Sequence, residues 1–273
     1  MIHPSAIIDP EARLGSQVAV GPHVVIEGPA QIGDECEIKA HAVITGNVIM
    51  GSRNVVGYGA VIGGEPQDFA FRTGVCSGVH IGDGNRIREY CTIHRGSKEN
   101  TATVVGDGCY LMAGAHLGHN VRLGDRVVVA NNALLGGYAQ VEEGVFIGGG
   151  CVFHQFVRVG RLAICQGLSA FSKDVPPFTM AAERNGVAGL NIVGLRRAGF
   201  SPEQRAEIKD AFALLYRHGL NVTQALEAAR ERDWGPEAEA FFDFLRAGKK
   251  RGYCGLLASR KHKSGSVDAD ADS

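Results

Sequence analysis

Three features typical of secreted, membrane or zinc-bound chains are missing from this sequence. No stretch approaches the roughly 18 consecutive apolar residues that a membrane span requires. The N-terminus, "MIHPSAIIDPEARLG", has no basic segment followed by an apolar core, so a signal peptide is not expected. The seven cysteines include no CxxC pair, which argues against both a disulfide framework and a thiolate zinc site. We therefore expect a soluble, cytoplasmic protein.

An excess of charge of one sign is missing too, because 28 basic residues stand against 29 acidic ones and the formal net charge is −1. Such a balance gives no general attraction to nucleic acid or to a membrane surface, and we expect no nucleic-acid partner and no stable membrane insertion. A local excess does occur, since residues 196–263 contain 14 Lys/Arg against 9 Asp/Glu. It fits either ordinary solvated helix faces or a docking surface for an acidic partner.

Glycine, by contrast, is abundant, and its 38 occurrences are about twice the usual frequency of roughly 7%. The glycines follow no Gly-X-Y period, but an apolar residue recurs at every sixth position through residues 2–62, 81–93 and 105–171. The position four residues after each of these is almost always small or β-branched. Neither a helix nor a simple strand has a period of six, and the repeat indicates a parallel β-helix.

Each repeat is expected to form a short strand and a corner, with the large sixth residue and the small residue facing inward. Four cysteines occupy the small position and are predicted core residues: Cys36, Cys91, Cys109 and Cys151. The pattern resembles hexapeptide-repeat folds, in which three repeats make one 18-residue coil of a triangular, left-handed prism. Residues 18 apart then stack about 4.8 Å apart along the axis. We therefore predict a mainly β protein, with a left-handed parallel β-helix over residues 1–185.

Two interruptions of the repeat predict loops on this prism. The six-residue phase shifts by one between Ile62 and Ile81, so residues 63–80 are expected to loop out. Residues 94–104 keep the phase but have Glu99 where an apolar residue is due, which indicates a second, shorter excursion. Long loops on a rigid scaffold often carry function.

After "DVPPF" the repeat ends, and a helical domain is predicted over residues 186–257. The segment 201–219 has the signals of a helix, with Ser201 as cap, Pro202 in the first turn and Gln204 completing a capping box. Shorter helices are predicted near 223–232 and 236–247. The polar tail 258–273 is low in aromatic residues and predicted to be disordered.

The stacking of successive coils brings polar residues and glycines together along one edge of the predicted prism. His119 lies two positions after an apolar repeat residue, at a corner, and stacks with Gly137 and Gln155. The other polar residues of this edge are His116, Asn120, Tyr138 and His154.

Three interpretations of this edge are open. The residues could be hydrogen-bonded locally in turns, or His116, His119 and His154 could bind a metal, although no well-placed carboxylate or fourth ligand is evident. The third is acid–base catalysis, because an imidazole can take a hydroxyl proton near neutral pH. A glycine such as Gly137 lets a substrate approach a backbone N–H, which could stabilise an oxyanion. That combination fits acyl transfer from a thioester.

Six segments carry a resemblance to a known family: "GDGNRIREYCTIHRG" (82–96), "LMAGAHLGHN" (111–120), "VANNALLGG" (129–137), "VFHQF" (152–156), "DVPPF" (174–178) and "LNIVGLRRAGFS" (190–201). Over residues 1–250 the sequence resembles the bacterial acyl carrier protein–UDP-N-acetylglucosamine O-acyltransferases, which begin lipid A synthesis. The resemblance implies transfer of an (R)-3-hydroxyacyl chain from acyl carrier protein to the sugar 3-hydroxyl. It implies no cofactor beyond the phosphopantetheine of the carrier, and a homotrimer with active sites between subunits.

The resemblance also assigns roles to residues. His119 matches the family's general base and Gly137 the residue whose backbone N–H stabilises the oxyanion. Gly167 matches a position where a bulky residue shortens the acyl slot, so glycine leaves room for a long chain. The positions that match the lining of the nucleotide-sugar and acyl pockets are Gln67, Asp68, His116, His154, Gln155, Asn191 and Arg197.

Four residues depart from the family pattern. Asn120 stands where most members have an aspartate, Tyr138 where a histidine is common, Ala70 where a lysine is found and Val193 where a glutamate is found. Because these changes spare His119 and Gly137, they concern the acceptor more than the acyl transfer. Three alternatives therefore stay open: N-acylation of a 3-amino UDP-sugar, a non-catalytic protein that binds nucleotide sugar or carrier protein, and a carbonic-anhydrase-like metalloenzyme.

Overall fold

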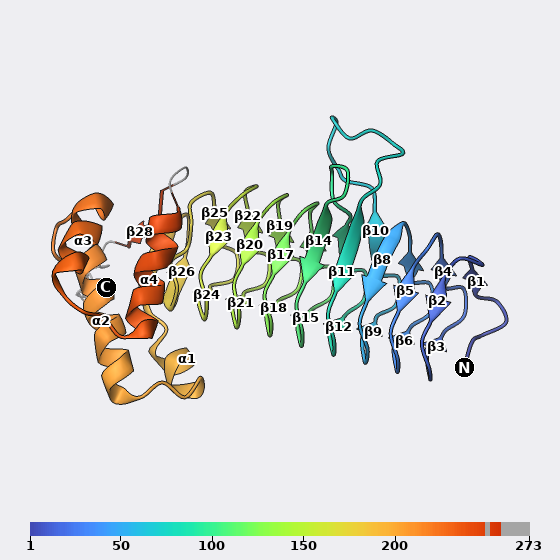
Figure 1. Cartoon of the computed structure of the whole chain (residues 1–273), viewed down its shortest axis with the longest axis horizontal. Helices are drawn as coiled ribbons and strands as arrows, with labels where there is room; N and C mark the ends of the chain where they lie inside the picture. The colour runs from blue at the N-terminus through green and yellow to red at the C-terminus, as the bar shows by residue number, and fades with distance from the viewer. Residues whose placement is uncertain (249–251, 258–273) are drawn as a thin grey trace, which may run out of the picture.

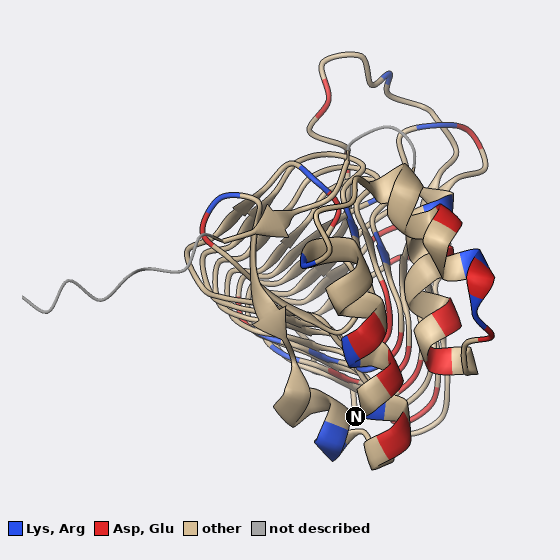
Figure 2. Cartoon of the chain, turned by 90° about the vertical axis from the view of Figure 1, so that its left-hand side faces the viewer, with Lys and Arg blue, Asp and Glu red and all other residues tan. Residues whose placement is uncertain are grey.

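The chain folds as a long triangular prism of parallel strands with helices packed at its C-terminal end (Figure 1). The structure is a computed structural model, and it describes residues 1–248 and 252–257. The predicted disordered tail 258–273 lies outside the described residues. Viewed along the prism, successive coils superpose in a triangular outline (Figure 2).

Each face of the prism is one sheet, and most strands have only two residues. The first face consists of β1 (Ile7–Ile8), β4 (Val25–Ile26), β7 (Val43–Ile44), β10 (Val61–Gly64), β13 (Thr92–His94), β16 (His116–Leu117), β19 (Leu134–Leu135), β22 (Val152–Phe153) and β25 (Ala170–Phe171). The second consists of β2 (Arg13–Leu14), β5 (Gln31–Ile32), β8 (Asn47–Met50), β11 (Gly78–Ile81), β14 (Ala102–Val105), β17 (Arg122–Leu123), β20 (Gln140–Val141) and β23 (Arg158–Val159). The third contains β3 (Ala19–Val20), β6 (Glu37–Ile38), β9 (Val55–Val56), β12 (Arg86–Ile87), β15 (Tyr110–Leu111), β18 (Val128–Val129), β21 (Phe146–Ile147), β24 (Ile164–Cys165), β26 (Thr179–Ala182), β27 (Gly186–Leu190) and β28 (Gly255–Leu256).

The core follows the six-residue pattern. The large repeat residues and the small residues four positions later fill the inside of the prism, and Cys36, Cys91, Cys109 and Cys151 are buried among them as predicted. Cys165, at a large position, is buried as well. Burial raises the pKa of the thiols of Cys91 and Cys109 to about 11, so these cysteines are inert core residues.

The register shows where the two loops leave the prism. In regular coils each residue pairs with its equivalent one coil later, as His116 pairs with Leu134. Val61 pairs with Thr92, which is much further along the chain than one regular coil, and the additional residues form the loop 65–77. Gly78 pairs with Ala102, again beyond one regular coil, and the smaller excess belongs to the loop 95–101. Both loops stand out from one edge in Figure 1.

The loop boundaries predicted from the sequence were too wide. Within the predicted loop 63–80, Gly63 and Gly64 still belong to β10, and residues 78–80 belong to β11. Within 94–104, His94 belongs to β13 and residues 102–104 to β14. The strands beside the insertions are longer than two residues because each pairs with a neighbouring extended strand, and a hexapeptide count does not register such extensions.

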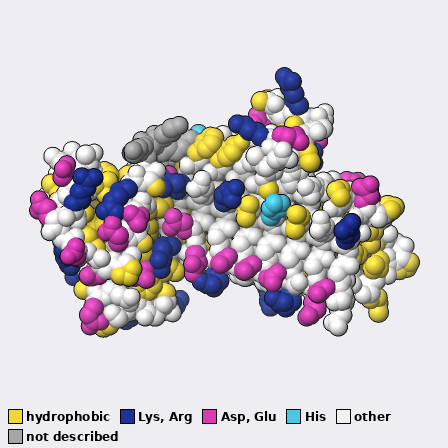
Figure 3. Space-filling view, viewed as in Figure 1, with side chains coloured by type: hydrophobic (Ala, Val, Ile, Leu, Met, Phe, Trp, Pro, Cys, Tyr) yellow, Lys and Arg dark blue, Asp and Glu magenta, His cyan; other side chains and the backbone are white. Residues whose placement is uncertain are grey.

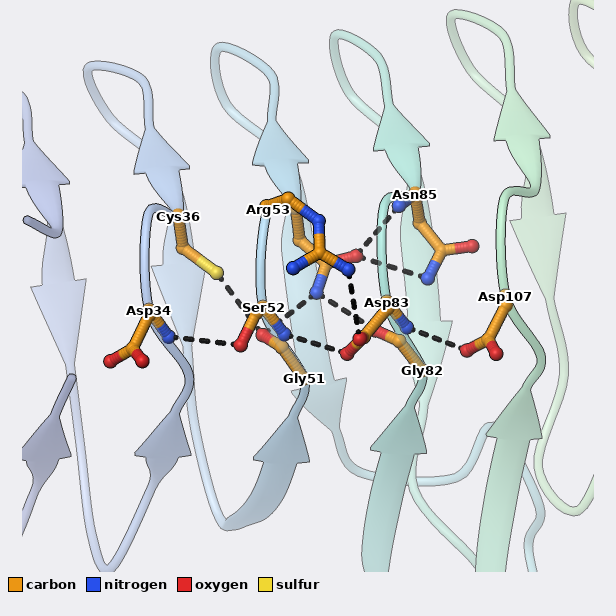
Figure 4. A network of polar contacts seen from close by, with 10 residues as sticks. Asp34, Cys36, Gly51, Ser52, Arg53, Gly82, Asp83, Asn85 and Asp107 are labelled. Atoms are coloured by element: carbon orange, nitrogen blue, oxygen red, sulfur yellow. Dashed lines mark hydrogen bonds and ion pairs between the residues drawn. The ribbon is translucent and has the colours of Figure 1, made fainter. Parts of the chain in front are cut away.

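Polar side chains at the corner between the second and third faces hold successive coils together. Figure 4 shows corner side chains that accept a backbone N–H from the coil before them: Ser52 Oγ accepts from Asp34, Asp83 Oδ1 from Ser52 and Asp107 Oδ1 from Asp83. Acidic side chains recur along the lower edge of the molecule in Figure 3. Next to this ladder, buried Asn54 and Asn85 bond to each other and to corner backbone groups. Corner N–H groups on this edge are thus satisfied by side chains.

The C-terminal helices agree with the sequence signals. Helix α2 (Pro202–Tyr216) begins with the predicted capping box between Ser201 and Gln204. The predicted helix 223–232 appears as α3 (Val222–Ala228) followed by the 3₁₀ turn η1 (Ala229–Glu231), and the predicted 236–247 is α4 (Pro236–Ala247).

The start of the C-terminal part differs from the prediction. Residues 186–190, assigned to a helical domain, form strand β27, which pairs antiparallel with β26 and reverses the chain at the end of the third face. The short helix α1 (Ile192–Arg197) was not predicted, because six residues are too few for a helical period to show.

One buried ion pair fastens the helices to the prism. Arg158 Nε on β23 lies 2.8 Å from Asp174 Oδ2, and the guanidinium also donates to the carbonyl of Phe244 in α4 at 2.8 Å. It stacks on the Phe244 ring, 4.2 Å from the ring centroid. The backbone of Asp174 bonds to Gly252 and Cys254 of the C-terminal segment. The Arg158 guanidinium therefore connects the prism, helix α4 and, through Asp174, the C-terminal segment.

We predict that Arg158→Ala lowers the free energy of unfolding by about 3 kcal/mol, because it leaves a buried carboxylate without its cation. The matched control is Arg126→Ala, since the Arg126–Glu143 pair has side chains 66% and 54% exposed and should contribute less than about 1 kcal/mol. Urea unfolding of both variants measures the difference. Equal losses would contradict a special role for Arg158.

Candidate active site

The cluster predicted from the stacking of coils lies at the corner between the first and second faces. His119 follows strand β16 and is only 6% exposed, while Asn120 is 8% exposed. The backbone N–H of Tyr138 donates to the His119 carbonyl at 2.9 Å, which aligns this corner with that of the next coil. Asn120 and Tyr138 both have left-handed backbones, with φ of 59° and 60°. The structure thus brings His119, Asn120, Gly137 and Tyr138 together.

The imidazole of His119 lies directly over Gly137. A Cβ atom added to Gly137 would be 2.5 Å from His119 Nε2, far inside van der Waals contact, so only glycine permits this ring position. The backbone N–H of Gly137 makes no hydrogen bond within the described residues. On the aspartate edge, the equivalent N–H is taken by a carboxylate of the next coil. The site therefore combines an imidazole nitrogen with a free backbone donor.

The hydrogen bonds of Asn120 determine which nitrogen of His119 carries the proton. Asn120 Oδ1 lies 2.9 Å from the backbone N of Ser97, and a backbone N–H can only donate, so the facing amide atom is the oxygen. The same oxygen lies 3.0 Å from His119 Nδ1, which must therefore donate to it. In the neutral ring this leaves the lone pair on Nε2, beside Gly137. His119 is oriented to accept a proton there.

His116 has a different environment from His119. It lies on β16, with Nδ1 2.8 Å from Thr92 Oγ1 and its ring centroid 5.2 Å from that of His94. Burial, with a smaller effect from His94, lowers the pKa of His116 to about 4. His116 is therefore neutral near pH 7 and can donate or accept hydrogen bonds without carrying charge.

Sequence reasoning assigned no role to His94, Thr92 or Ser97. His94 Nδ1 bonds to the carbonyl of Glu65, which ties the loop 65–77 to the strand beside His116. The segment "TIHRG" contributed to the resemblance, but its residues do not stack on His119 at the regular spacing of the coils. The signal that could have found them is the insertion at 95–101, which turns this segment toward the corner.

The remaining predicted residues are more dispersed. His154 and Gln155 are exposed on the same edge, and His154 helps to line a pocket with Ser172 and Arg184. Gln67 and Asp68 are exposed on the loop 65–77.

Three further predicted residues lie away from this corner. Gly167 follows β24 and lies at the opposite edge of the first face. Arg197 is exposed in α1, whereas Asn191 is buried and caps that helix, accepting from Gly194 N at 2.9 Å and donating to Leu162 O at 2.8 Å. Asn191 therefore positions α1 within this chain.

The metal interpretation finds no support in this geometry. Within residues 1–248 and 252–257, no group of three His, Cys, Asp or Glu side chains is placed to hold a metal ion. His116 and His119 each have Nδ1 engaged by Thr92 and Asn120.

Comparisons with known proteins agree with the geometry. A family model for domain 2 of UDP N-acetylglucosamine O-acyltransferase matches residues 174–254, and a model for six bacterial transferase hexapeptide repeats matches residues 102–137. The acyl-[acyl-carrier-protein]–UDP-N-acetylglucosamine O-acyltransferase of Janthinobacterium sp. (strain Marseille) is 46% identical over 249 residues, which is 90% of this chain and 95% of that protein. The chain belongs to this O-acyltransferase family.

Solved structures extend the likeness to three dimensions. The UDP-N-acetylglucosamine acyltransferase from Bacteroides fragilis superposes with a TM-score of 0.87 at 38% identity, covering 93% of this chain and 99% of that one. The enzyme from Francisella novicida has a TM-score of 0.87 at 32% identity, covering 96% and 95%. The predicted left-handed β-helix with C-terminal helices is thus confirmed, and the chain is an acyltransferase. No helix in the described ranges has the length and hydrophobicity of a membrane span.

The lowered pKa of His116 predicts a specific loss of stability of this acyltransferase in acid. An unfolded imidazole binds its proton near pH 6.5, whereas folded His116 does so only near pH 4. Between these values the unfolded state holds more protons, so stability falls as the pH falls. In His116→Asn, the urea midpoint should drop less between about pH 7 and 4.5 than in the unchanged protein. Exposed His80, replaced in the same way, is the control, and an equal drop in all three proteins would refute the assignment.

Proposed function

We propose that the protein transfers an (R)-3-hydroxyacyl chain from acyl carrier protein to the 3-hydroxyl of UDP-N-acetylglucosamine, the first step of lipid A biosynthesis. The observation that carries the proposal is the lone pair of His119 Nε2, held beside the free N–H of Gly137. The relatives named for this reaction support the choice of donor and acceptor. No cofactor is needed beyond the phosphopantetheine that carries the acyl chain, and the carrier protein and nucleotide sugar consumed favour a cytoplasmic location.

In the proposed mechanism, His119 Nε2 removes the proton of the 3-hydroxyl while the oxygen attacks the thioester carbonyl. The carbonyl oxygen becomes an oxyanion and accepts the N–H of Gly137. When the tetrahedral intermediate collapses, the carbon–sulfur bond breaks and the protonated imidazole returns its proton to the leaving thiolate. His116 stays neutral throughout and is suited to a hydrogen bond with a substrate hydroxyl or phosphate.

We include in the proposal a homotrimer with active sites between subunits. Apolar side chains that one chain leaves exposed support it: Leu134 and Val152 on the outer side of the first face, and Phe156 and Leu168 at its two edges. Phe69 in the loop 65–77 is fully exposed, which suits a loop that covers a neighbouring subunit. The exposed Gly167 would then leave room for a long acyl chain along this interface.

A second acceptor is favoured by one observation. The partner of His119 Nδ1 is the neutral amide of Asn120, so no carboxylate offsets the imidazolium charge that forms during proton transfer. An uncharged amine is already a good nucleophile, so its attack needs less assistance from a general base. N-acylation of a 3-amino UDP-sugar is therefore the alternative reaction of the same site.

His119→Ala should reduce kcat by a factor of about 10² to 10⁴, the usual contribution of a general base. The assay uses β-hydroxyacyl carrier protein and UDP-N-acetylglucosamine, with product followed by mass spectrometry. His80→Ala, on the outer side of the second face, is the matched control and should keep full activity. Full activity in His119→Ala would rule out the mechanism, and binding without turnover in the unchanged protein would favour the non-catalytic alternative.

The acceptor is decided by competition between the 3-hydroxyl and 3-amino UDP-sugars. We expect kcat/KM to be higher for UDP-N-acetylglucosamine. Asn120→Asp supplies the missing carboxylate and should raise kcat with the hydroxyl sugar several-fold, while changing the rate with the amine little. A preference of more than about tenfold for the amine in the unchanged protein would replace O-acylation by N-acylation.

A further inference from the structure

Ser97 touches the neighbour of the proposed base from outside the regular stack. It lies in the loop 95–101, between β13 and β14, and its backbone N–H donates to Asn120 Oδ1 at 2.9 Å. Its hydroxyl is 3.0 Å from the same oxygen. A residue 23 positions before Asn120 thus makes two contacts to one amide oxygen, because the extra residues of the loop carry it over the corner.

The direction of each hydrogen bond in this network follows from the atoms present. Asn120 Oδ1 can only accept, so Ser97 Oγ–H donates to it. The hydroxyl of Tyr138 lies 3.1 Å from Ser97 Oγ, and it must donate because the serine has no second proton. The ring of Tyr138 also meets His119 edge-on at 5.2 Å and stacks on Phe156 at 4.8 Å. Asn120 Oδ1 therefore accepts directly from Ser97 O–H and from His119 Nδ1–H. Tyr138 O–H acts on it indirectly, by donating to Ser97 Oγ.

The amide of Asn120 needs this arrangement because it has two different ends. With its oxygen and nitrogen exchanged by a flip about the Cβ–Cγ bond, it would place its NH₂ group against His119 Nδ1 and against both donors of Ser97. The ring would then accept at Nδ1 and carry its proton on Nε2, where no lone pair would remain beside Gly137. A carboxylate has no such wrong orientation, since both of its oxygens accept. The neighbouring backbone N–H of Asn120 is held separately by Thr103 Oγ1 at 2.8 Å.

We propose that Ser97 is a positioning residue that fixes the tautomer of His119 through Asn120, a task created by the amide at position 120. Tyr138 supports it by donating to Ser97 Oγ, so the hydroxyl proton of Ser97 stays on Asn120. The loop 95–101 is then part of the catalytic apparatus, although Ser97 touches no reacting atom. The kinetic part of this inference rests on the proposed function, whereas the tautomer itself does not.

The test combines ¹⁵N NMR of histidine-labelled full-length protein with steady-state kinetics. Spectra are recorded near pH 8, where an ordinary imidazole is neutral, and the His119 signals are identified by their loss in His119→Gln. The unchanged protein should show protonated Nδ1 and unprotonated Nε2. Ser97→Ala keeps the backbone N–H bond to Asn120 Oδ1 but removes the hydroxyl bond. The Nε2–H tautomer should then become visible, and kcat should fall about five- to tenfold with KM changing less than twofold. Ser97→Thr, which keeps the hydroxyl, should restore both.

The decisive comparison repeats Ser97→Ala in an Asn120→Asp background. A carboxylate cannot be misoriented, so the loss in kcat should shrink to less than about twofold and the tautomer should stay unchanged. Thr101→Ala is the control for loop shape and should leave the tautomer as it is. Among the described residues, Thr101 Oγ1 bonds to Lys98 of the same loop and not to Asn120. An equal loss in both backgrounds, or an unchanged tautomer in Ser97→Ala, would overturn the proposal. If the unchanged protein transferred no acyl chain while Ser97→Ala still changed the tautomer, the proposed function alone would fail.

Discussion

Parallel stacking of each coil on the next, in one fixed register, is the constraint on which the rest of the structure depends. Each corner residue lies against its equivalent in the next coil. The side chain of the later residue therefore determines whether the backbone N–H of the earlier one is hydrogen-bonded. On one edge the next side chain is often an aspartate or serine that accepts this N–H, and the edge is closed by a ladder. At Gly137 there is no such acceptor within the described residues, and the N–H stays free. The same geometry thus produces one edge whose backbone donors are satisfied and another that keeps a donor for the proposed reaction.

The environments of two histidines three positions apart explain how one strand and corner provide different chemistry. His116 faces outward from the first face, where burial and His94 keep it neutral. His119 lies at the corner, with one nitrogen committed to Asn120 and the other directed at Gly137. Two histidines at this spacing can bind one metal ion, but here their rings face different partners, Thr92 and Asn120. Their environments differ because His116 lies on the strand β16 and His119 at the corner that follows it, a corner that the six-residue repeat predicts.

The parts of the fold that follow the six-residue repeat could be predicted from the sequence, including the buried cysteines, the corner position of His119 and its stacking on Gly137. Helix caps such as Ser201 were predictable as well, because a capping box is a local signal. The loop boundaries and β27 were not, since they depend on which strands pair, and α1 has too few residues for a helical period to show. The contact of Ser97 with Asn120 could not be predicted either, because Ser97 lies in an insertion, where the regular 18-residue spacing of stacked residues does not hold.

The antiparallel strand β27 has a consequence for assembly. A parallel β-helix leaves an open row of backbone donors and acceptors at its last coil, and another chain can add to such an edge. By turning back on β26, β27 ends the parallel ladder of the third face, and β28 and the helices held by Arg158 follow behind it. The C-terminal part of the chain thereby covers the open edge of its own third sheet. Growth of prisms end on end into fibres is opposed at the C-terminal end, which leaves the sides of the prism for the contacts of the proposed trimer.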